Sequence, residues 1–224
     1  MSDQPALIGR RATVVCLVLA PLLEVVEALL SPLRGTSTAA DLRGIDGHQG
    51  LFVVSVLVGL LATLLYVPAF LGLATRCVGA APVAARLGAA FAVWSMMGFM
   101  GVRMAQAVEL QAIRDGLDRG DTARLMDHLV TNPIGAASLV LLLAGSAVGL
   151  VALALAGWRA GLPRPALVLV AVFPFLDLAL PSQTGTIASH VALLVGLVWL
   201  AVALARETGP GQRARAGQTA PALA

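Results

Sequence analysis

The chain has 224 residues, of which 58% are hydrophobic and only 12% are charged, and its mean hydropathy is +0.89. Soluble domains carry about 25% charged residues, so this composition excludes an ordinary soluble protein and predicts an all-α, polytopic membrane protein. The 15 basic residues are all Arg and are scattered among the loops, so the pI of about 9.6 does not indicate nucleic-acid binding.

Six apolar stretches predict six transmembrane helices. They cover about residues 12–33, 51–74, 83–113, 134–157, 165–180 and 186–206, which together form one six-helix transmembrane domain. The first stretch is too long for the apolar part of a signal peptide and carries two Glu, so we expect it to be retained. The third exceeds the length that a bilayer requires, which predicts tilt or projection beyond the membrane.

The segments between and beside the spans are polar. Residues 1–11 form the N-terminal segment, residues 34–50 read as a loop, and the Gly-, Pro-, Gln- and Arg-rich residues 207–224 predict a disordered tail. Between the third and fourth spans, Asp121 is predicted to cap a short helix that lies along the membrane interface. Its apolar stripe comprises Leu125, Met126, Leu129 and Val130.

The distribution of Arg predicts the orientation. One side of the six spans receives few acids, Asp3 and Glu207, and most of the cations: Arg10, Arg11, Arg76, Arg86, Arg159, Arg164, Arg206, Arg213 and Arg215. The segments on the other side are close to neutral, because Arg and Asp alternate there. The positive-inside rule therefore predicts that both termini are cytoplasmic. The use of Arg without Lys resembles a GC-rich bacterial coding bias, so we expect the membrane to be a bacterial cytoplasmic membrane.

The strongly polar residues within the spans gather in the outer half of the membrane. At about 1.5 Å per residue, Glu24, Glu27 and Asp177 lie about 17–21 Å from the inner boundary of a core of about 30 Å. On the same scale Arg103 lies about 24 Å from that boundary, and His190 about 6 Å below the outer one. Because charged side chains at this depth are costly, their clustering predicts a shared cavity or an ion-pair network.

The charges in this cluster are unequal. Arg103 is the one fixed cation, and Gln106 shares its helix face, whereas Glu24, Glu27 and Asp177 are three acids. Neutrality therefore requires a bound proton, a metal, a cationic ligand or a charged His190. The alternative interpretation is that Arg103 pairs with one of the two Glu residues only to hold two helices together.

Aromatic rings accompany two of the charged groups. Phe99 precedes Arg103 by four residues and Phe173 precedes Asp177 by four, so each ring shares a helix face with a charge. Pro174 removes a backbone donor and is expected to open the helix near Asp177. Aromatic faces beside a buried acid suit the binding of a cation or a carbocation. The alternative is that both rings are ordinary packing residues.

Metal and cofactor motifs are weak. His48, His128 and His190 all map to the outer half or the outer loops, so a three-His zinc site is conceivable. None of them has the close spacing with Glu that makes zinc motifs specific. The sequence contains no phosphate-binding loop, no nucleophilic Ser motif and no paired Cys, and we predict no metal and no cofactor.

Two sequence motifs carry a resemblance. The residues Gly47-His-Gln-Gly50 precede the second span, which reads Leu-Leu-Tyr-Val-Pro-Ala-Phe-Leu-Gly at residues 64–72. With an acid near the centre of the first span, this layout resembles a group of small bacterial six-span membrane proteins of unknown function. The chain also distantly resembles the bacterial integral-membrane terpene cyclases, which implies protonation of an alkene or epoxide by a buried carboxylic acid.

The leading functional hypothesis is therefore a membrane-embedded enzyme that uses acid catalysis on a hydrophobic or prenylated small molecule. The candidate acids are Glu24, Glu27 and Asp177, and the candidate substrate-binding residues are Arg103, Gln106, His190, Phe99 and Phe173. One alternative is a proton-coupled small-molecule transporter or exporter. Another is a non-catalytic membrane subunit whose Arg–Glu pair is structural.

Overall fold

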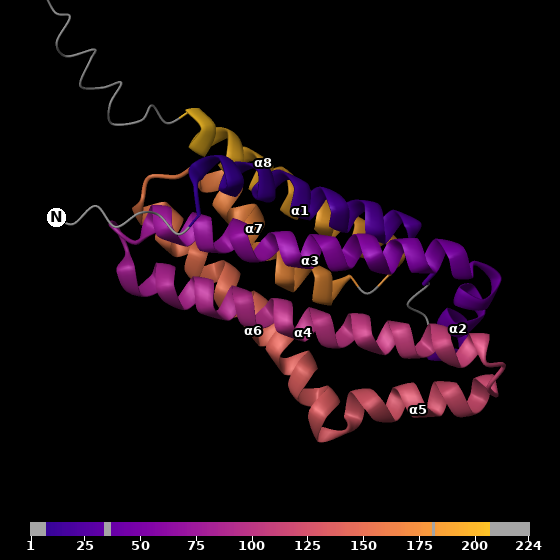
Figure 1. The fold of residues 1–224 in the computed structure, drawn as a ribbon. Helices are drawn as coiled ribbons and strands as arrows, with labels where there is room; N and C mark the ends of the chain where they lie inside the picture. Colours follow the sequence, from indigo (N-terminus) through magenta and orange to yellow (C-terminus); the bar gives the residue numbers. More distant parts are fainter. Residues whose placement is uncertain (1–7, 34–36, 181, 207–224) are drawn as a thin grey trace, which may run out of the picture.

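The protein is all-α over the residues that its computed structural model describes, which are residues 8–33, 37–180 and 182–206. This part of the chain contains eight helices and no strand (Figure 1). The helices are α1 (Arg10–Leu30), α2 (Thr38–Gly47), α3 (Gln49–Cys77), α4 (Pro82–Arg114), α5 (Arg119–Thr131), α6 (Pro133–Arg159), α7 (Arg164–Ala179) and α8 (Gln183–Arg206). The predicted tail at residues 207–224 lies outside the described residues.

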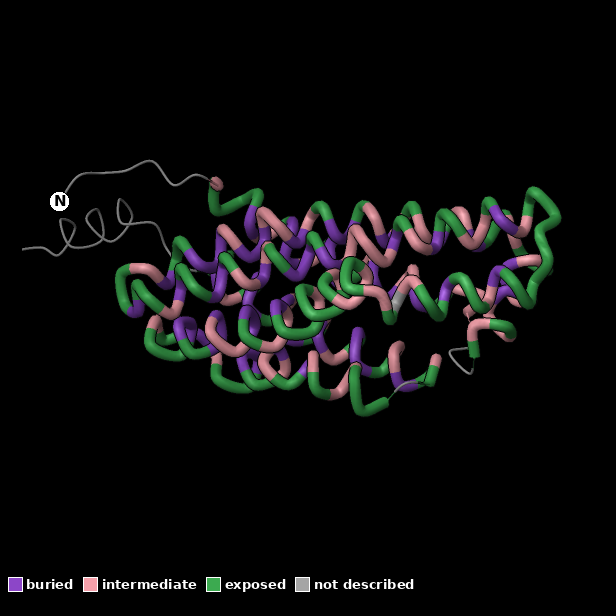
Figure 2. Tube along the Cα trace, turned by 90° about the horizontal axis from the view of Figure 1, so that it is seen from below, coloured by how far each residue is buried: buried purple, intermediate pink, exposed green. Residues whose placement is uncertain are grey.

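Helices α1, α3, α4, α6 and α8 are long and apolar enough to cross a membrane. With 16 residues, α7 rises only about 24 Å, which is less than the hydrocarbon thickness of about 30 Å. Leu57, Leu61 and Leu64 form a stripe along α3, and each is at least half exposed. Exposed residues also cover the outer faces of the other helices (Figure 2). A surface this apolar is suited to contact with lipid tails, as in a multi-pass membrane protein.

The segment at residues 34–50, predicted as a loop, contains helix α2. Ser37 caps it by accepting a hydrogen bond from the Ala40 backbone N–H, and Asp41 lies in its first turn, where a negative charge is favourable. Leu42 and Ile45 are buried on one face of the helix, which explains why this polar segment folds. The loop prediction was wrong because two buried side chains and a cap outweigh the low average hydrophobicity.

The short helix predicted between the third and fourth spans is present as α5, but its cap is Asp118 rather than Asp121. The Asp118 carboxylate accepts a hydrogen bond from the Asp121 backbone N–H. Within the predicted stripe, Met126 is buried, while Leu125 is exposed. The side chain of Val130 lies outside the described part of the structure.

The internal prolines do not interrupt their helices. Pro68 lies inside α3 and Pro174 lies inside α7, and both helices continue to their predicted ends. The expectation that Pro174 opens α7 near Asp177 was therefore wrong. Helices α6 and α8, which precede and follow α7 in the chain, both pack against it. Such packing allows a helix to continue across a single missing backbone hydrogen bond.

The helices form two closely packed pairs, α1 with α3 and α4 with α6, and α7 and α8 complete the bundle (Figure 1). Glycines allow α4 and α6 to approach closely, because side chains at Gly88, Gly98 and Gly149 would meet the backbone of the other helix. The described termini lie at one end of the bundle, where the Arg10 guanidinium donates to the Ala205 carbonyl at 2.5 Å. The opposite end, formed by α2 and α5 and joined by the Asp46–Arg119 ion pair, is called the α2/α5 end.

We expect Gly98→Ala to destabilise the fold by about 1–3 kcal/mol, because overpacking a close helix contact forces backbone shifts. An added Cβ at Gly98 would lie 2.6 Å from the Leu142 backbone nitrogen, and neither helix backbone can yield locally. Thermal unfolding of the full chain in lipid nanodiscs measures the effect. The matched control is Gly50→Ala, where no atom lies within 4 Å of the added Cβ. Equal melting temperatures for the two variants would contradict the close-contact explanation.

Candidate functional site

A buried ion pair joins α1 to α4. Arg103 is only 6% exposed, and its Nη1 donates to Glu27 Oε1 at 2.8 Å and to Gln106 Oε1 at 3.1 Å. Its Nη2 lies 3.8 Å from Glu24 Oε2. The predicted pairing of Arg103 with one of the two Glu residues is consistent with this geometry, and Gln106, predicted on the same helix face, contacts Arg103. The Phe99 ring lies beneath the guanidinium, with 5.9 Å between Arg103 Cζ and the ring centroid.

Helix α3 makes room for the guanidinium with a glycine. A Cβ at Gly59 would lie 2.4 Å from Arg103 Nη2 and 2.6 Å from its Cζ. Any side chain at this position would therefore push Arg103 away from its carboxylates. Gly59 is thus part of the site because it leaves space for the Arg103 guanidinium, and the pattern of charged residues does not predict this role.

His190 on α8 lies between the carboxylates of Glu24 and Asp177. Its Nε2 is 3.5 Å from Glu24 Oε2, and its Nδ1 is 3.8 Å from Asp177 Oδ1. Nδ1 also lies 2.7 Å from the Thr186 carbonyl oxygen, one turn earlier in the helix. The Phe173 ring packs edge-on against the imidazole at 5.2 Å, so Phe173 accompanies His190 rather than Asp177.

Asp177 differs from the other two acids. Its side chain is 38% exposed, whereas the side chains of Glu24 and Glu27 are 4% and 12% exposed. Ser189 on α8 donates to Asp177 Oδ1 at 2.7 Å. Because Asp177 is partly exposed and accepts a hydrogen bond from this hydroxyl, its charge is compensated in part by solvent, which leaves Glu24 and Glu27 as the two buried acids. The excess of buried acid is therefore smaller than the sequence suggests.

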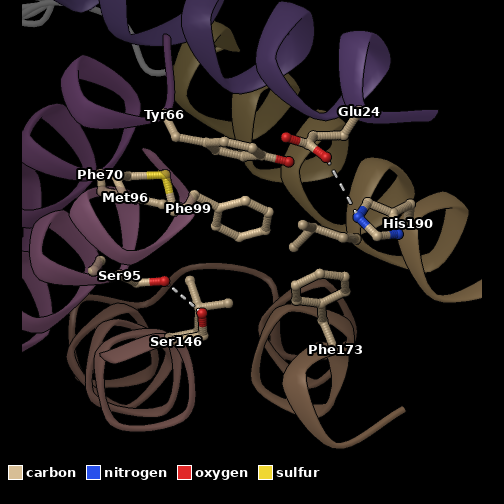
Figure 3. A pocket seen from close by; sticks show the side chains of 12 residues that line it. Glu24, Tyr66, Phe70, Ser95, Met96, Phe99, Ser146, Phe173 and His190 are labelled. Atoms are coloured by element: carbon tan, nitrogen blue, oxygen red, sulfur yellow. Dashed lines mark hydrogen bonds and ion pairs between the residues drawn. The ribbon is translucent and has the colours of Figure 1, made fainter. Parts of the chain in front are cut away.

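A small cavity lies beside Glu24 and His190, with side chains from α1, α3, α4, α6, α7 and α8 around it (Figure 3). Its walls include four aromatic rings, those of Tyr66, Phe70, Phe99 and Phe173. The free volume of about 20 Å³ is enough for roughly one water molecule. A larger occupant therefore requires side chains such as Met96 to move, and an unbranched Met can do so at little cost.

Two buried polar atoms of the cavity wall have no hydrogen-bond partner among the described residues. They are Glu24 Oε2, which lies 3.5 Å from His190 Nε2, and the Tyr66 hydroxyl, which points toward the Glu24 carboxyl group (Figure 3). An unpartnered buried polar group costs about 1–3 kcal/mol, so a pair of them on one wall indicates a place for a polar or cationic group. On the opposite side, the Ser95 and Ser146 hydroxyls lie 2.5 Å apart.

The structure divides the sequence-predicted site residues into two sets. Glu24, His190, Phe99 and Phe173 line the cavity. Arg103 contacts Glu24 and Asp177 contacts His190, while Glu27 and Gln106 bind Arg103, and none of these four residues lines the cavity.

Sequence reasoning did not identify four further residues, Tyr66, Ser95, Ser146 and Ser189, as part of the site. One signal was available for Tyr66, the only Tyr in the chain, because it follows Gly59 by seven residues and so shares its helix face. The three serines carry no comparable signal, since serine is common in membrane helices.

The histidines form no metal cluster within the described residues 8–33, 37–180 and 182–206. No group of three or more His, Cys, Asp or Glu side chains in this part of the chain could hold a metal ion. His48 lies at the start of α3 and His128 in α5, both at the α2/α5 end, whereas His190 is within the bundle. The three histidines considered as zinc ligands are therefore not brought together.

Comparisons of the chain with protein-family models, with curated proteins and with solved structures gave no match. The resemblance to integral-membrane terpene cyclases accordingly stays a prediction. The chemistry of the site is inferred from its geometry alone.

The role of Gly59 is testable with a double-mutant cycle. Arg103→Met should cost about 3–5 kcal/mol of stability, because it leaves buried carboxylates without their cation. Gly59→Ala should also destabilise, because its Cβ displaces the guanidinium. In the Arg103→Met background, however, Gly59→Ala should cost less than 1 kcal/mol, as the collision is gone. Unfolding in mixed micelles measures all four proteins, and additive effects would contradict the proposed contact.

Proposed function

We propose that the protein is a membrane-embedded enzyme that donates a proton to a hydrophobic, prenyl-like small molecule, with Glu24 as the acid. The observation that carries this proposal is the position of Glu24 Oε2. This oxygen is buried, makes no hydrogen bond among the described residues, and lies 3.5 Å from His190 Nε2, while Glu24 itself lines a cavity with four aromatic rings. An apolar, water-poor site disfavours the charged form of a carboxylic acid, so an acid in such a site can hold its proton until a bound substrate takes it.

The aromatic walls suit the charge that protonation creates. When a carbon–carbon double bond takes the Glu24 proton, its electron pair forms the new C–H bond and the neighbouring carbon becomes cationic. The negative faces of aromatic rings stabilise such a cation. Transfer of a proton from an adjacent carbon to the Glu24 carboxylate then restores neutrality, so the product is an isomer of the substrate and Glu24 is regenerated. This is the reaction class implied by the resemblance to terpene cyclases.

The membrane arrangement we propose has six spans, with α7 and α8 as the last pair, and both termini on the cytoplasmic side of a bacterial cytoplasmic membrane. Two observations support it. The described termini lie at one end of the bundle, together with most of the Arg residues outside the site. Although α7 is short, its packing against α6 and α8 can hold it at membrane depth.

The alternatives make different use of the same residues. A proton-coupled transporter needs a polar path from the cavity to the termini end of the bundle. Among the described residues, buried polar side chains are rare in that direction. A structural subunit needs only the Arg103–Glu27 pair, and this pair does not account for the unpartnered atoms at the cavity. The enzyme hypothesis accounts for both.

Acid catalysis can be tested without knowledge of the product. Purified protein in nanodiscs is incubated in D₂O with a panel of prenylated phenols and polyprenyl alcohols, and the recovered lipids are analysed by mass spectrometry. We expect wild type to place deuterium on carbon in one panel member. Glu24→Gln should lower this incorporation at least a hundredfold, because the amide cannot donate a comparable proton. The control variant is Glu109→Gln, which changes a carboxylate of α4 that does not line this cavity.

The outcomes separate the functions. Deuterium incorporation that is equal in wild type and Glu24→Gln would contradict the role of Glu24. Absence of incorporation across the panel, with proton-driven uptake of a panel member into proteoliposomes, would favour the transporter. If Glu24→Gln melts far below Glu109→Gln, the structural interpretation gains support.

Tyr66 provides a second test that separates activity from stability. Because the buried Tyr66 hydroxyl has no hydrogen-bond partner among the described residues, Tyr66→Phe removes no bond and should leave the melting temperature unchanged or slightly higher. We expect deuterium incorporation to fall about tenfold, since this hydroxyl is the neutral donor nearest the Glu24 wall of the cavity. A large loss of stability with unchanged activity would contradict this role.

A further inference from the structure

The geometry around His190 fixes where its protons lie. Nδ1 is 2.7 Å from the Thr186 carbonyl oxygen, and two acceptors cannot approach this closely without a hydrogen between them. Nδ1 therefore carries a proton in either charge state of the ring. Nε2, on the opposite edge, faces Glu24 Oε2 at 3.5 Å. In the neutral ring Nε2 is a bare acceptor, and in the charged ring it is a donor.

The pairing of Nε2 with a carboxyl oxygen then restricts the proton count. A bare Nε2 beside an ionised Glu24 would place two acceptors together in a buried site, which is unfavourable. One proton between them removes the conflict. It resides either on Glu24, with His190 neutral, or on His190, with Glu24 ionised. A second proton would leave two donors facing each other.

Asp177 acts on the other edge of the ring. Its Oδ1 lies 3.8 Å from Nδ1 and accepts from the Ser189 hydroxyl, whose oxygen is 3.4 Å from the same Nδ1. A partly exposed carboxylate at this distance favours the charged imidazole without contacting the cavity. An acid placed in this way cannot reach a molecule in the cavity.

We infer that Glu24 and His190 hold one proton between them at the cavity wall, and that Asp177, with Ser189, is a positioning residue for this proton rather than the acid. The other ionisable or charged groups facing the pair are Arg103 of α4, Glu27 of α1 and Tyr66 of α3. Because Arg103 is bound to Glu27, we expect the charge of His190, rather than that of Arg103, to change with the charge of Glu24. The inference deepens the proposed function of Glu24, but the proton can be observed without a substrate.

The test is ¹⁵N NMR of the full chain in nanodiscs, labelled on its three histidines. The His190 signals are assigned by their loss in His190→Gln. In wild type we expect Nδ1 to stay protonated across the titration, while Nε2 alone gains and loses a proton. In Glu24→Gln the ring should be neutral and Nδ1-protonated at a pH where wild type carries both protons, because the Gln amide then donates to Nε2.

Asp177 is tested in the same experiment. In Asp177→Asn, His190 should lose its second proton about one pH unit below wild type, the low end of the range for a nearby opposite charge. Ser189→Ala should give a smaller shift in the same direction and provides an independent test if Asp177→Asn is unstable. The control is Asp127→Asn, an exposed α5 carboxylate that accepts from Thr38.

Three results would overturn the inference. The first is a His190 ring protonated at Nε2 and bare at Nδ1. The second is a Glu24→Gln variant in which His190 titrates as in wild type. The third is an Asp177→Asn variant that matches Asp127→Asn. None of these results depends on turnover. If NMR shows that Glu24 and His190 share a proton but no deuterium is transferred to a substrate, the enzyme proposal is rejected and the inference about the proton is kept.

Discussion

The ion pair between Arg103 and Glu27 is the interaction on which the site depends. Removing two charges from water costs several kcal/mol each, and this cost is recovered only with close geometry and further hydrogen bonds. The 2.8 Å contact to Glu27, the Gln106 hydrogen bond and the Phe99 ring together provide that geometry. Because these groups come from α1 and α4, and Gly59 of α3 admits the guanidinium, three helices must be in register for the pair to form.

Once Arg103 is committed to Glu27, Glu24 is left with weaker partners. Its Oε2 is 3.8 Å from Arg103 and 3.5 Å from His190, neither of which is a good hydrogen bond. A site that served only stability would be expected to satisfy a buried carboxylate fully. The attachment of α1 to α4 and the incomplete pairing of the buried Glu24 therefore have one cause, because Arg103, the strong donor, is bound to Glu27.

The main features of the fold could be predicted from the sequence because apolar length dominates in a membrane helix. Each predicted span agrees with an observed helix to within a few residues, although the structure identifies only five as long enough to cross. Helix α2 was missed because its stability depends on two buried residues, Leu42 and Ile45, in an otherwise polar segment. The prediction that Pro174 opens α7 was wrong because it used only the local tendency of proline to break a helix. The packing of α6 and α8 against α7 involves residues far away in the sequence and outweighs this tendency.

For the site, residue type and spacing predicted which charges meet but not how they are oriented. Helical spacing placed Phe99 with Arg103, and the contact is observed. The same rule placed Phe173 with Asp177, yet the ring turns to His190 of the next helix. Whether an acid faces the cavity or solvent depends on helix rotation, which a one-dimensional pattern leaves open. This is why Glu24 and Asp177, equivalent as residues in a span, have different positions relative to the cavity.

The low aromatic content of the chain illustrates the same difference between composition and arrangement. At 4% aromatic residues, the sequence offers little shielding for a carbocation if the rings are spread evenly. The fold instead places four rings, those of Tyr66, Phe70, Phe99 and Phe173, around the cavity that Glu24 and His190 also line. Stabilisation of a cation depends on the rings within about 6 Å of it and not on the total number. Four rings from three different helices at one small cavity therefore carry more weight for the chemistry of this site than the composition does against it.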